Sequence, residues 1–236
     1  MPNWCLNEIR ASEKVLNTIY DKEKGQATFQ KVMPMPESLM VTAGGPQRTA
    51  IIYALVKMNK TLREETLEKL KNNRFDYYED IAKYTGKDKK SQEKLKELYK
   101  YNKEYKPDIE EQNLGIRHLK ELGNTYISNI INYGYPDWYG WRNDYWGTKW
   151  DACESYGSPE EGYLSFDTAW CPPEGIVGKL FEMFPNEDID WYYEEPGMDF
   201  AGNYTPDYEG GFVNTPCPVP NYDEEMEDEV EWEEAI

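Results

Sequence analysis

The fold is decided by residues 163–194, which read YLSFDTAWCPPEGIVGKLFEMFPNEDIDWYYE. The first eight residues alternate between apolar and polar types, as in a half-buried strand. The apolar face of this strand would carry Leu164, Phe166, Thr168 and Trp170. The proline pair that follows suits a helix start, because proline lacks only an N–H that needs no partner there. This helix would bury Ile176, Val177, Leu180, Phe181 and Phe184. Alternation returns at residues 188–194, so the stretch predicts strand, helix and strand.

The beginning of the chain predicts the same order of elements. Residues 3–11 read as a strand, and Ser12 is a suitable cap for a short helix that ends at Gly25. Residues 26–33 read as a second strand, which the prolines after it would stop. Strand–helix–strand is half of a split βαβ unit. The fold class predicted is therefore α+β, with a ferredoxin-like split βαβ sheet.

A large helical insertion is predicted after the second strand. Apolar residues recur there at three- and four-residue steps, which is typical of one helix face. The clearest such stripe is Leu119, Leu122, Tyr126, Ile130 and Tyr133. Residues 87–106 hold eight lysines, which indicates a solvated helix face or a basic docking surface. The predicted domains are residues 1–36 plus 134–212 for the ferredoxin-like part, 46–133 for the insertion, and 213–236 for an acidic tail.

Charge is distributed very unevenly along the chain. The net charge is −19, but residues 1–134 carry 23 Lys and Arg against 19 Asp and Glu, whereas residues 135–236 carry 3 against 26. In residues 223–234, nine of twelve side chains are acidic, and their mutual repulsion predicts a disordered tail. Such a charge repels nucleic acid and anionic membranes and attracts basic proteins. No apolar run approaches the ~18 residues of a membrane span, and the chain starts without a leader pattern. We expect a soluble protein of the cytoplasm.

Residues 138–151 form an aromatic segment, WYGWRNDYWGTKWD, which holds half of the eight tryptophans. Unpaired charges are costly to bury beside such rings. Either the rings cover paired charges as a structural plug, or part of the segment is an exposed binding surface. The candidate binding residues here are Trp138, Tyr139, Trp141, Arg142, Asp144, Trp146, Lys149, Trp150, Asp151, Asp167 and Trp170. A second candidate set lies in the tail: Asp223, Glu224, Glu225, Glu227, Asp228, Glu229, Glu231 and Trp232.

Signatures of catalysis are weak. His118 is the single histidine, the four cysteines form no Cys-x-x-Cys pair, and Gly44-Gly45 is a turn signal rather than a phosphate loop. We therefore expect no metal, no cofactor and no catalytic residue. One enzymatic alternative is a hydrolase, because tryptophans flank a set of carboxylates as they do in sugar-cleaving clefts. These carboxylates are Asp137, Asp144, Asp151 and Asp167.

Several motifs occur together in a fixed order. They are Asn3-Trp4-Cys5 with Asn7, Met33-Pro34-Met35-Pro36, the aromatic segment with Trp146-Gly-Thr-Lys-Trp-Asp151, Phe166-Asp-Thr-Ala-Trp-Cys-Pro-Pro173, and Tyr193-Glu-Glu-Pro-Gly197. In these motifs the chain resembles the YubB-type family of phage and plasmid proteins, over residues 1–36 and 134–212. The resemblance implies a ferredoxin-like domain and a mobile-element origin. It implies no activity and no catalytic residues.

The resulting hypothesis is a non-catalytic interaction protein of a phage or mobile element. It would bind and inhibit a basic, nucleic-acid-binding host protein in the host cytoplasm, as an anti-defence or anti-CRISPR factor. Carboxylates would stand in for the phosphates of DNA, and aromatic side chains would anchor the contact. The alternative is a small-ligand protein that binds a nucleotide or a sugar in the aromatic segment. No direct contact with nucleic acid or membrane is expected.

Overall fold

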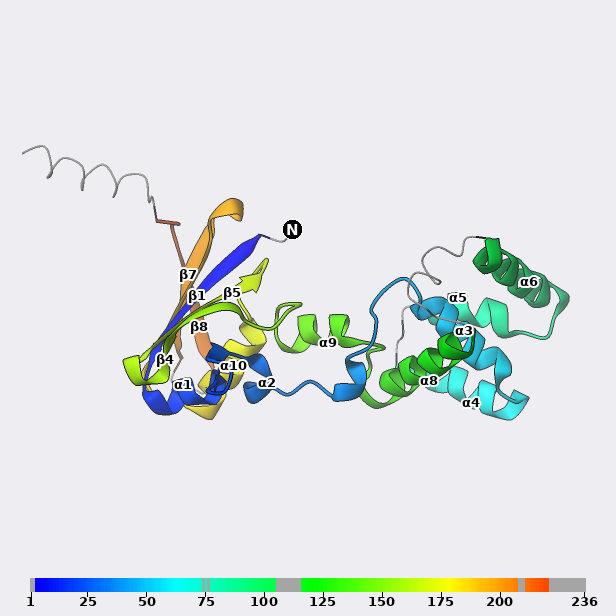
Figure 1. Cartoon of the computed structure of the whole chain (residues 1–236), viewed down its shortest axis with the longest axis horizontal. Helices are drawn as coiled ribbons and strands as arrows, with labels where there is room; N and C mark the ends of the chain where they lie inside the picture. The colour runs from blue at the N-terminus through cyan, green and yellow to red at the C-terminus, as the bar shows by residue number, and fades with distance from the viewer. Residues whose placement is uncertain (1–2, 74, 76, 105–115, 208–210, 221–236) are drawn as a thin grey trace, which may run out of the picture. The chain divides into compact units, whose positions relative to one another are not determined.

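The computed structural model describes residues 3–73, 75, 77–104, 116–207 and 211–220. The chain divides into two compact units (Figure 1). We call Met1–Pro34 with Arg142–Ile236 the ferredoxin-like unit, and Met35–Trp141 the helical unit. The helical unit thus begins before residue 46 and ends after residue 133, the limits that the sequence suggested. None of the described helices combines the length and the apolar character needed to cross a membrane.

The ferredoxin-like unit is built on a six-stranded sheet in the order β4-β5-β1-β6-β7-β8, with every neighbouring pair antiparallel. Its strands are β1 (Trp4–Ala11), β4 (Cys153–Ser158), β5 (Tyr163–Ala169), β6 (Ile189–Glu195), β7 (Phe200–Pro206) and β8 (Phe212–Cys217). Its longer helices are α1 (Glu13–Ile19) and α10 (Glu174–Met183). The 3₁₀ turns η2 (Pro159–Glu161) and η3 (Pro196–Met198) close the β4–β5 and β6–β7 hairpins.

The topology confirms the predicted fold class. The elements β1, α1, β4, β5, α10 and β6 follow the β-α-β-β-α-β order of a ferredoxin-like fold, and their strands lie in the order β4-β5-β1-β6. Strands β7 and β8 extend this sheet beyond β6. The predicted strand, helix and strand of residues 163–194 correspond to β5, α10 and β6.

The hydrophobic core lies on one side of this sheet. Buried positions of the three central strands share one face, because their side chains alternate; they are Cys5, Asn7, Ile9, Leu164, Phe166, Thr168, Ile189, Trp191 and Tyr193. Helices α1, α10 and the short α2 (Phe29–Val32) bury their apolar side chains there (Figure 1). The alternate positions of the strands form the other side, which we call the open face.

The predicted strand over residues 26–33 is wrong. A two-residue strand β3 (Gln26–Ala27) pairs only with β2 (Tyr20–Asp21), and residues 29–32 form α2. The helix starts there because the hydroxyl of Thr28 accepts a hydrogen bond from the Gln30 N–H at 3.4 Å. The insertion therefore follows β3 in the chain but precedes the second strand of the large sheet. The first helix also ends at Ile19 rather than at Gly25, which turns between β2 and β3 with φ +67°.

Three further expectations differ from the structure. The strand expected at residues 148–153 begins only at Cys153. Trp170 was expected on the buried face of its strand, but the strand ends at Ala169 and Trp170 is exposed. The tail was placed from residue 213, yet β8 runs to Cys217 and pairs with β7. Its polar composition resembles a linker, and only its partner strand makes it part of the sheet.

The helical unit has its own core. Its helices are α3 (Gln47–Lys57), α4 (Lys60–Asn72), α5 (Tyr78–Thr85), α6 (Lys89–Glu104) and α8 (Ile116–Tyr133), with the 3₁₀ turn η1 (Glu37–Leu39) before them. Leu119, Tyr126 and Ile130 of the predicted stripe are buried, whereas Tyr133 is exposed. Gly123 allows α3 and α8 to pack closely, since a Cβ there would lie 2.0 Å from the Ala50 carbonyl oxygen.

Candidate functional site

The aromatic segment is shared between the two units. Helix α9 (Trp138–Tyr145) contains the boundary, which falls between Trp141 and Arg142. In the helical unit, Trp141 is buried and Trp138 contacts the ring of Tyr139, with centroids 5.7 Å apart. Part of the segment is therefore core rather than surface.

Asp137 also belongs to the helical unit. Its carboxylate accepts hydrogen bonds from the Tyr139 N–H at 2.9 Å and from the Gln47 side chain at 2.8 Å. Burial raises the pKa of Asp137, and these two hydrogen bonds oppose the rise. The Asp137 carboxylate thus holds the first turn of α9 in place.

Trp146 is the largest buried side chain of the segment and belongs to the ferredoxin-like unit. Its indole N–H donates to the Met33 carbonyl at 2.9 Å, and its ring meets the edge of Phe29, with centroids 5.6 Å apart. The guanidinium of Arg142 lies 4.6 Å from the Trp146 ring centroid. Burial lowers the pKa of Arg142, and the charge of Asp151 partly restores it. Trp146 and Arg142 thus fit the first of the two alternatives that the sequence offered, a structural plug in which a ring covers a charge.

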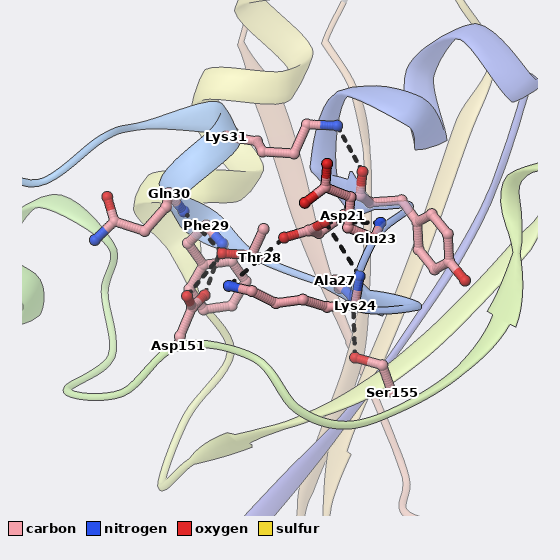
Figure 2. A network of polar contacts seen from close by, with 11 residues as sticks. Asp21, Glu23, Lys24, Ala27, Thr28, Phe29, Gln30, Lys31, Asp151 and Ser155 are labelled. Atoms are coloured by element: carbon pink, nitrogen blue, oxygen red, sulfur yellow. Dashed lines mark hydrogen bonds and ion pairs between the residues drawn. The ribbon is translucent and has the colours of Figure 1, made fainter.

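Asp151 fixes the start of α2 (Figure 2). One carboxylate oxygen accepts the Thr28 hydroxyl at 2.8 Å, and the other accepts the N–H groups of Phe29 at 2.7 Å and Ala152 at 3.0 Å. Both oxygens are therefore engaged in structural hydrogen bonds. This arrangement supplies an acceptor for the Phe29 N–H, which has no partner within the helix. It leaves Asp151 little capacity to act as a general base.

Lys149 and Trp150 of the segment lie beside two tryptophans from elsewhere in the chain. We call this group the tryptophan cluster: Trp4, Lys149, Trp150 and Trp170. The ammonium of Lys149 lies 4.2 Å from the Trp150 ring centroid and 5.9 Å from that of Trp170. The rings of Trp4 and Trp150 are 5.8 Å apart and tilted. Trp4 is 39% exposed and Trp170 is 43% exposed. The cluster is an aromatic surface that already holds a cation.

The backbone of Trp170 is strained. Its φ is +76°, a region that large non-glycine residues rarely occupy. The Trp170 N–H donates to the Asn3 carbonyl at 3.0 Å, which ties the residue to the start of β1. This conformation turns the chain at the end of β5 and leaves the indole at the surface.

The open face carries charged and aromatic side chains in regular rows. Read across β5, β1 and β6, the rows are Asp167–Leu6–Glu194, Ser165–Glu8–Tyr192 and Tyr163–Arg10–Asp190. Trp4 pairs with Ala169 in the next row, so the tryptophan cluster adjoins this face. At the outer strand, Tyr156 is opposite Ser165 and is 75% exposed.

Hydrogen bonds orient the acids of the open face. The Tyr163 hydroxyl donates to Glu8 at 2.6 Å, and the Tyr192 hydroxyl donates to Glu194 at 2.7 Å. Arg10 lies 3.7 Å from the second oxygen of Glu8. The tyrosine hydroxyls hold the two carboxylates in place without neutralising them, whereas Arg10 partly offsets the charge of Glu8.

Asp167 of the open face lies near a second carboxylate, that of Glu154. Burial, followed by the charge of Glu154, raises the pKa of Asp167. Glu154 has φ +46° at an irregularity in β4 between Cys153 and Tyr156. A distorted strand therefore places one carboxylate near another, an arrangement that destabilises the fold and concentrates negative charge.

The charge imbalance follows the two units. The ferredoxin-like unit contains 8 Lys and Arg against 29 Asp and Glu, whereas the helical unit contains 18 against 16. Within the described residues of the ferredoxin-like unit, the counts are 8 and 19. Ion pairs within this unit involve five of its own cations: Arg10, Lys14, Lys22, Lys24 and Lys179. A surplus of carboxylates remains even without the tail.

No catalytic grouping stands out in the part of the chain that the structure describes. No cluster of three or more His, Cys, Asp or Glu side chains suitable for a metal ion occurs among those residues. Burial raises the pKa of Cys5 to about 12 and also raises the pKa of Cys153 and Cys171. These thiols are protonated at neutral pH and are poor nucleophiles.

The tail residues proposed from the sequence lie outside the described residues. These are Asp223, Glu224, Glu225, Glu227, Asp228, Glu229, Glu231 and Trp232. The open face, by contrast, was missed apart from Asp167. Alternation in residues 190–194 carries the signal, because it separates a polar row from an apolar row. Residues 4–10 alternate less clearly, since Leu6 lies on the open face and Asn7 is buried.

Comparison with known proteins supports the fold and leaves the function open. Residues 145–234 match the family model described as a ferredoxin-like domain in Api92-like protein. The crystal structure of a protein api92 from Yersinia pseudotuberculosis is similar at a TM-score of 0.40 and 11% identity, covering 94% of this chain and 99% of that chain. A likeness of that degree carries no argument. Among curated proteins, none matches the chain. These comparisons link the chain neither to the YubB-type family nor to phages.

Proposed function

We propose that this protein is a non-catalytic interaction protein that binds a cationic protein partner on its open face. The observation that carries the proposal is the set of acidic rows on the open face. Glu8, Asp167 and Asp190 project from three adjacent strands on the side opposite to α1, α2 and α10. Asp190 is exposed, Glu8 and Asp167 are partly exposed, and Glu194 of the same rows is buried. A sheet face that presents carboxylates complements a basic surface and repels nucleic acid.

Aromatic side chains give this surface the composition of an interface. Tyr156, Tyr163 and Tyr192 stand among the acids, and the tryptophan cluster lies at the start of β1. Tyrosine and tryptophan supply large contact area with few rotatable bonds, and they are enriched among the residues that dominate binding energy. The acids would govern attraction and the rings would anchor the contact.

The target that we propose is a host protein with a basic, nucleic-acid-binding groove, such as a CRISPR effector nuclease. The carboxylates of the open face and tail would occupy the places of backbone phosphates. An anti-defence role in the host cytoplasm, and an origin in a phage or other mobile element, are part of this proposal. The support for it is the charge of the ferredoxin-like unit together with the motif resemblance of the sequence.

The test compares two variants of equal charge. In Glu8→Gln/Asp167→Asn/Asp190→Asn, three acids of the open face become amides. In the control Glu13→Gln/Glu23→Gln/Glu182→Gln, three exposed acids on the helical side or in the β2–β3 turn do so. The full chain is titrated with an arginine–glycine repeat peptide and with a purified CRISPR effector nuclease, in competition with DNA. We expect the open-face variant to bind the peptide about tenfold more weakly at low salt, by ~0.5 kcal/mol per charge.

The control variant should lose less than about half as much binding free energy as the open-face variant does. Binding should also weaken steeply between ~50 and ~500 mM salt, because exposed charges are screened. Equal losses in both variants would show that only net charge matters, and binding that ignores salt would exclude the electrostatic mechanism. A variant with amides at the acids of residues 223–234 measures the share of the tail.

The alternative function is a small-ligand site in the tryptophan cluster, for a nucleotide or a sugar. The observation that favours it is Lys149, a cation set between two indole rings that an anionic planar ligand would fit. Quenching of tryptophan fluorescence by a nucleotide, lost in Lys149→Met, is the result that this alternative requires.

A further inference from the structure

The tryptophan cluster has the components of an aromatic cage for a cation. Indole rings attract cations most strongly among the aromatic side chains, over distances of up to about 6 Å from the ring centroid. Both ring distances of the Lys149 ammonium, 4.2 Å to Trp150 and 5.9 Å to Trp170, fall in this range. Trp4 extends the aromatic surface beside Trp150. The protein thus shows, with its own side chain, which chemistry this site accepts.

The resident cation is held weakly. Within the described residues, the ammonium of Lys149 contacts rings and makes no ion pair. A cation–π contact at an exposed site changes an equilibrium by only about two- to fivefold. Two of the three rings remain more than a third exposed. Another cation can therefore replace Lys149 without breaking a carboxylate pair.

The position of the cluster suits a partner on the open face. Trp4 is on the same side of β1 as Leu6, Glu8 and Arg10, one row from the pair of Leu6 and Asp167. A chain that lies on the acidic rows reaches the cluster within one or two further residues of its length. Trp170 combines a strained φ with an exposed indole at this edge, and backbone strain of this kind clusters at functional sites.

We propose that the tryptophan cluster is a cage for a cationic side chain of the partner, preferably arginine, and that Lys149 is an internal occupant which the partner displaces. A guanidinium is planar and stacks on indole rings, so it fits such a cage better than an ammonium does. This inference rests on the proposed function. It adds a specific anchoring site to the electrostatic attraction of the open face.

The test exchanges the resident cation. In Lys149→Met the cage loses its occupant, and we expect the arginine–glycine repeat peptide to bind about three- to fivefold more tightly than it binds the matched control Lys179→Met. Lys179 lies on α10 and pairs with Glu182 at 2.9 Å, so its loss changes net charge equally but outside the cluster. Trp150→Leu should weaken peptide binding about fivefold.

A spectroscopic measurement follows the displacement directly. In the free protein, the side-chain methylene protons of Lys149 should resonate upfield because of the ring currents of Trp150 and Trp170. Saturation with the peptide should return these resonances to ordinary positions. The variant Lys149→Arg keeps a cation in the cage, so its affinity for the peptide should stay within about threefold of that of the parent protein.

Three outcomes would overturn the proposal. The Lys149 protons stay upfield while the peptide binds, Lys149→Met binds no more tightly than Lys179→Met, or ATP binds the cluster and loses affinity in Lys149→Met. In each case the open face is judged separately, by the variant Glu8→Gln/Asp167→Asn/Asp190→Asn. Loss of peptide binding in that variant alone retains the docking face and rejects the cage.

Discussion

Trp146 and Trp150 are four residues apart in one segment, and the fold uses them in opposite ways. Trp146 is fully buried, donates to a backbone carbonyl and covers a guanidinium. Trp150 lies at the surface edge with a lysine over its ring and a second tryptophan beside it. Aromatic residues near charges therefore do not define a site by themselves. What distinguishes the two places is whether the fold buries the ring and the charge beside it: Trp146 is fully buried, whereas Trp150 is only partly buried.

The largest expected effect concerns the buried side of this comparison. Trp146→Ala should lower the free energy of unfolding by ~3–5 kcal/mol, because it opens a cavity and leaves the Met33 carbonyl without its donor. Tyr156→Ala, on the exposed face, should change it by less than ~1 kcal/mol. Urea denaturation of both variants measures the difference. Equal losses would show that Trp146 contributes no more to the core than an exposed tyrosine of β4 does.

Next in size is the contrast between two aspartates of the segment. Asp151→Asn should lower the free energy of unfolding by ~1–3 kcal/mol, since the amide replaces one of two acceptor oxygens that serve Thr28, Phe29 and Ala152. Asp144→Asn, at an exposed position of α9, should change it by less than ~0.5 kcal/mol. Thermal unfolding distinguishes the two. A stable Asp151→Asn protein would contradict the structural role assigned to this carboxylate.

The backbone at the tryptophan cluster gives a smaller effect of defined sign. Trp170→Gly and Trp170→Ala both remove the indole, but only glycine adopts φ +76° without strain. The glycine variant should therefore be more stable than the alanine variant by ~1 kcal/mol. Chemical denaturation of the pair measures the strain alone. If alanine were equal or better, Trp170 would not occupy a left-handed conformation.

The smallest effect is a dependence on pH at Asp167. Its pKa is raised in the folded protein, so the folded state binds the proton more tightly than the unfolded chain does. The stabilisation from this proton is complete below the ordinary carboxyl pKa of about 4 and is lost as the pH rises through the folded value. Asp167→Asn should thus be slightly more stable than the parent at pH 7, by less than ~1 kcal/mol, and this gain should vanish in acid.

Glu154→Gln provides the control for that titration. Removing this neighbour takes away one of the two causes of the raised pKa of Asp167. The pH at which Asp167 titrates, followed by NMR, should therefore fall in Glu154→Gln. An unchanged titration would show that the two carboxylates do not interact.

Local pattern was enough to predict much of the fold, and tertiary contacts explain where it failed. Alternation in residues 163–169 and the apolar stripe from Ile176 to Phe181 predicted β5 and α10, because burial on one face imposes those periods. The prediction of a strand at residues 29–32 was wrong, because the helix there depends on a carboxylate 122 positions away in sequence. The prediction of a tail from residue 213 missed β8, because its exposed, polar residues become a strand only beside β7.

The candidate site could be predicted only in part. Lys149, Trp150 and Trp170 were among the expected residues, but their separation from Trp146 and Asp151 depends on which side chains the core covers. Trp4 joins the cluster from the other end of the chain through the pairing of β1 with β5. Strand order decides which faces meet, and a single sequence does not contain that order explicitly.

The most direct test of the account is the affinity of the full chain for the arginine–glycine repeat peptide at low salt, in the two charge-matched variants. We expect a loss of about tenfold when Glu8, Asp167 and Asp190 become amides, and a clearly smaller loss when Glu13, Glu23 and Glu182 do. Equal affinities of the two variants would contradict the claim that the open face is the docking surface.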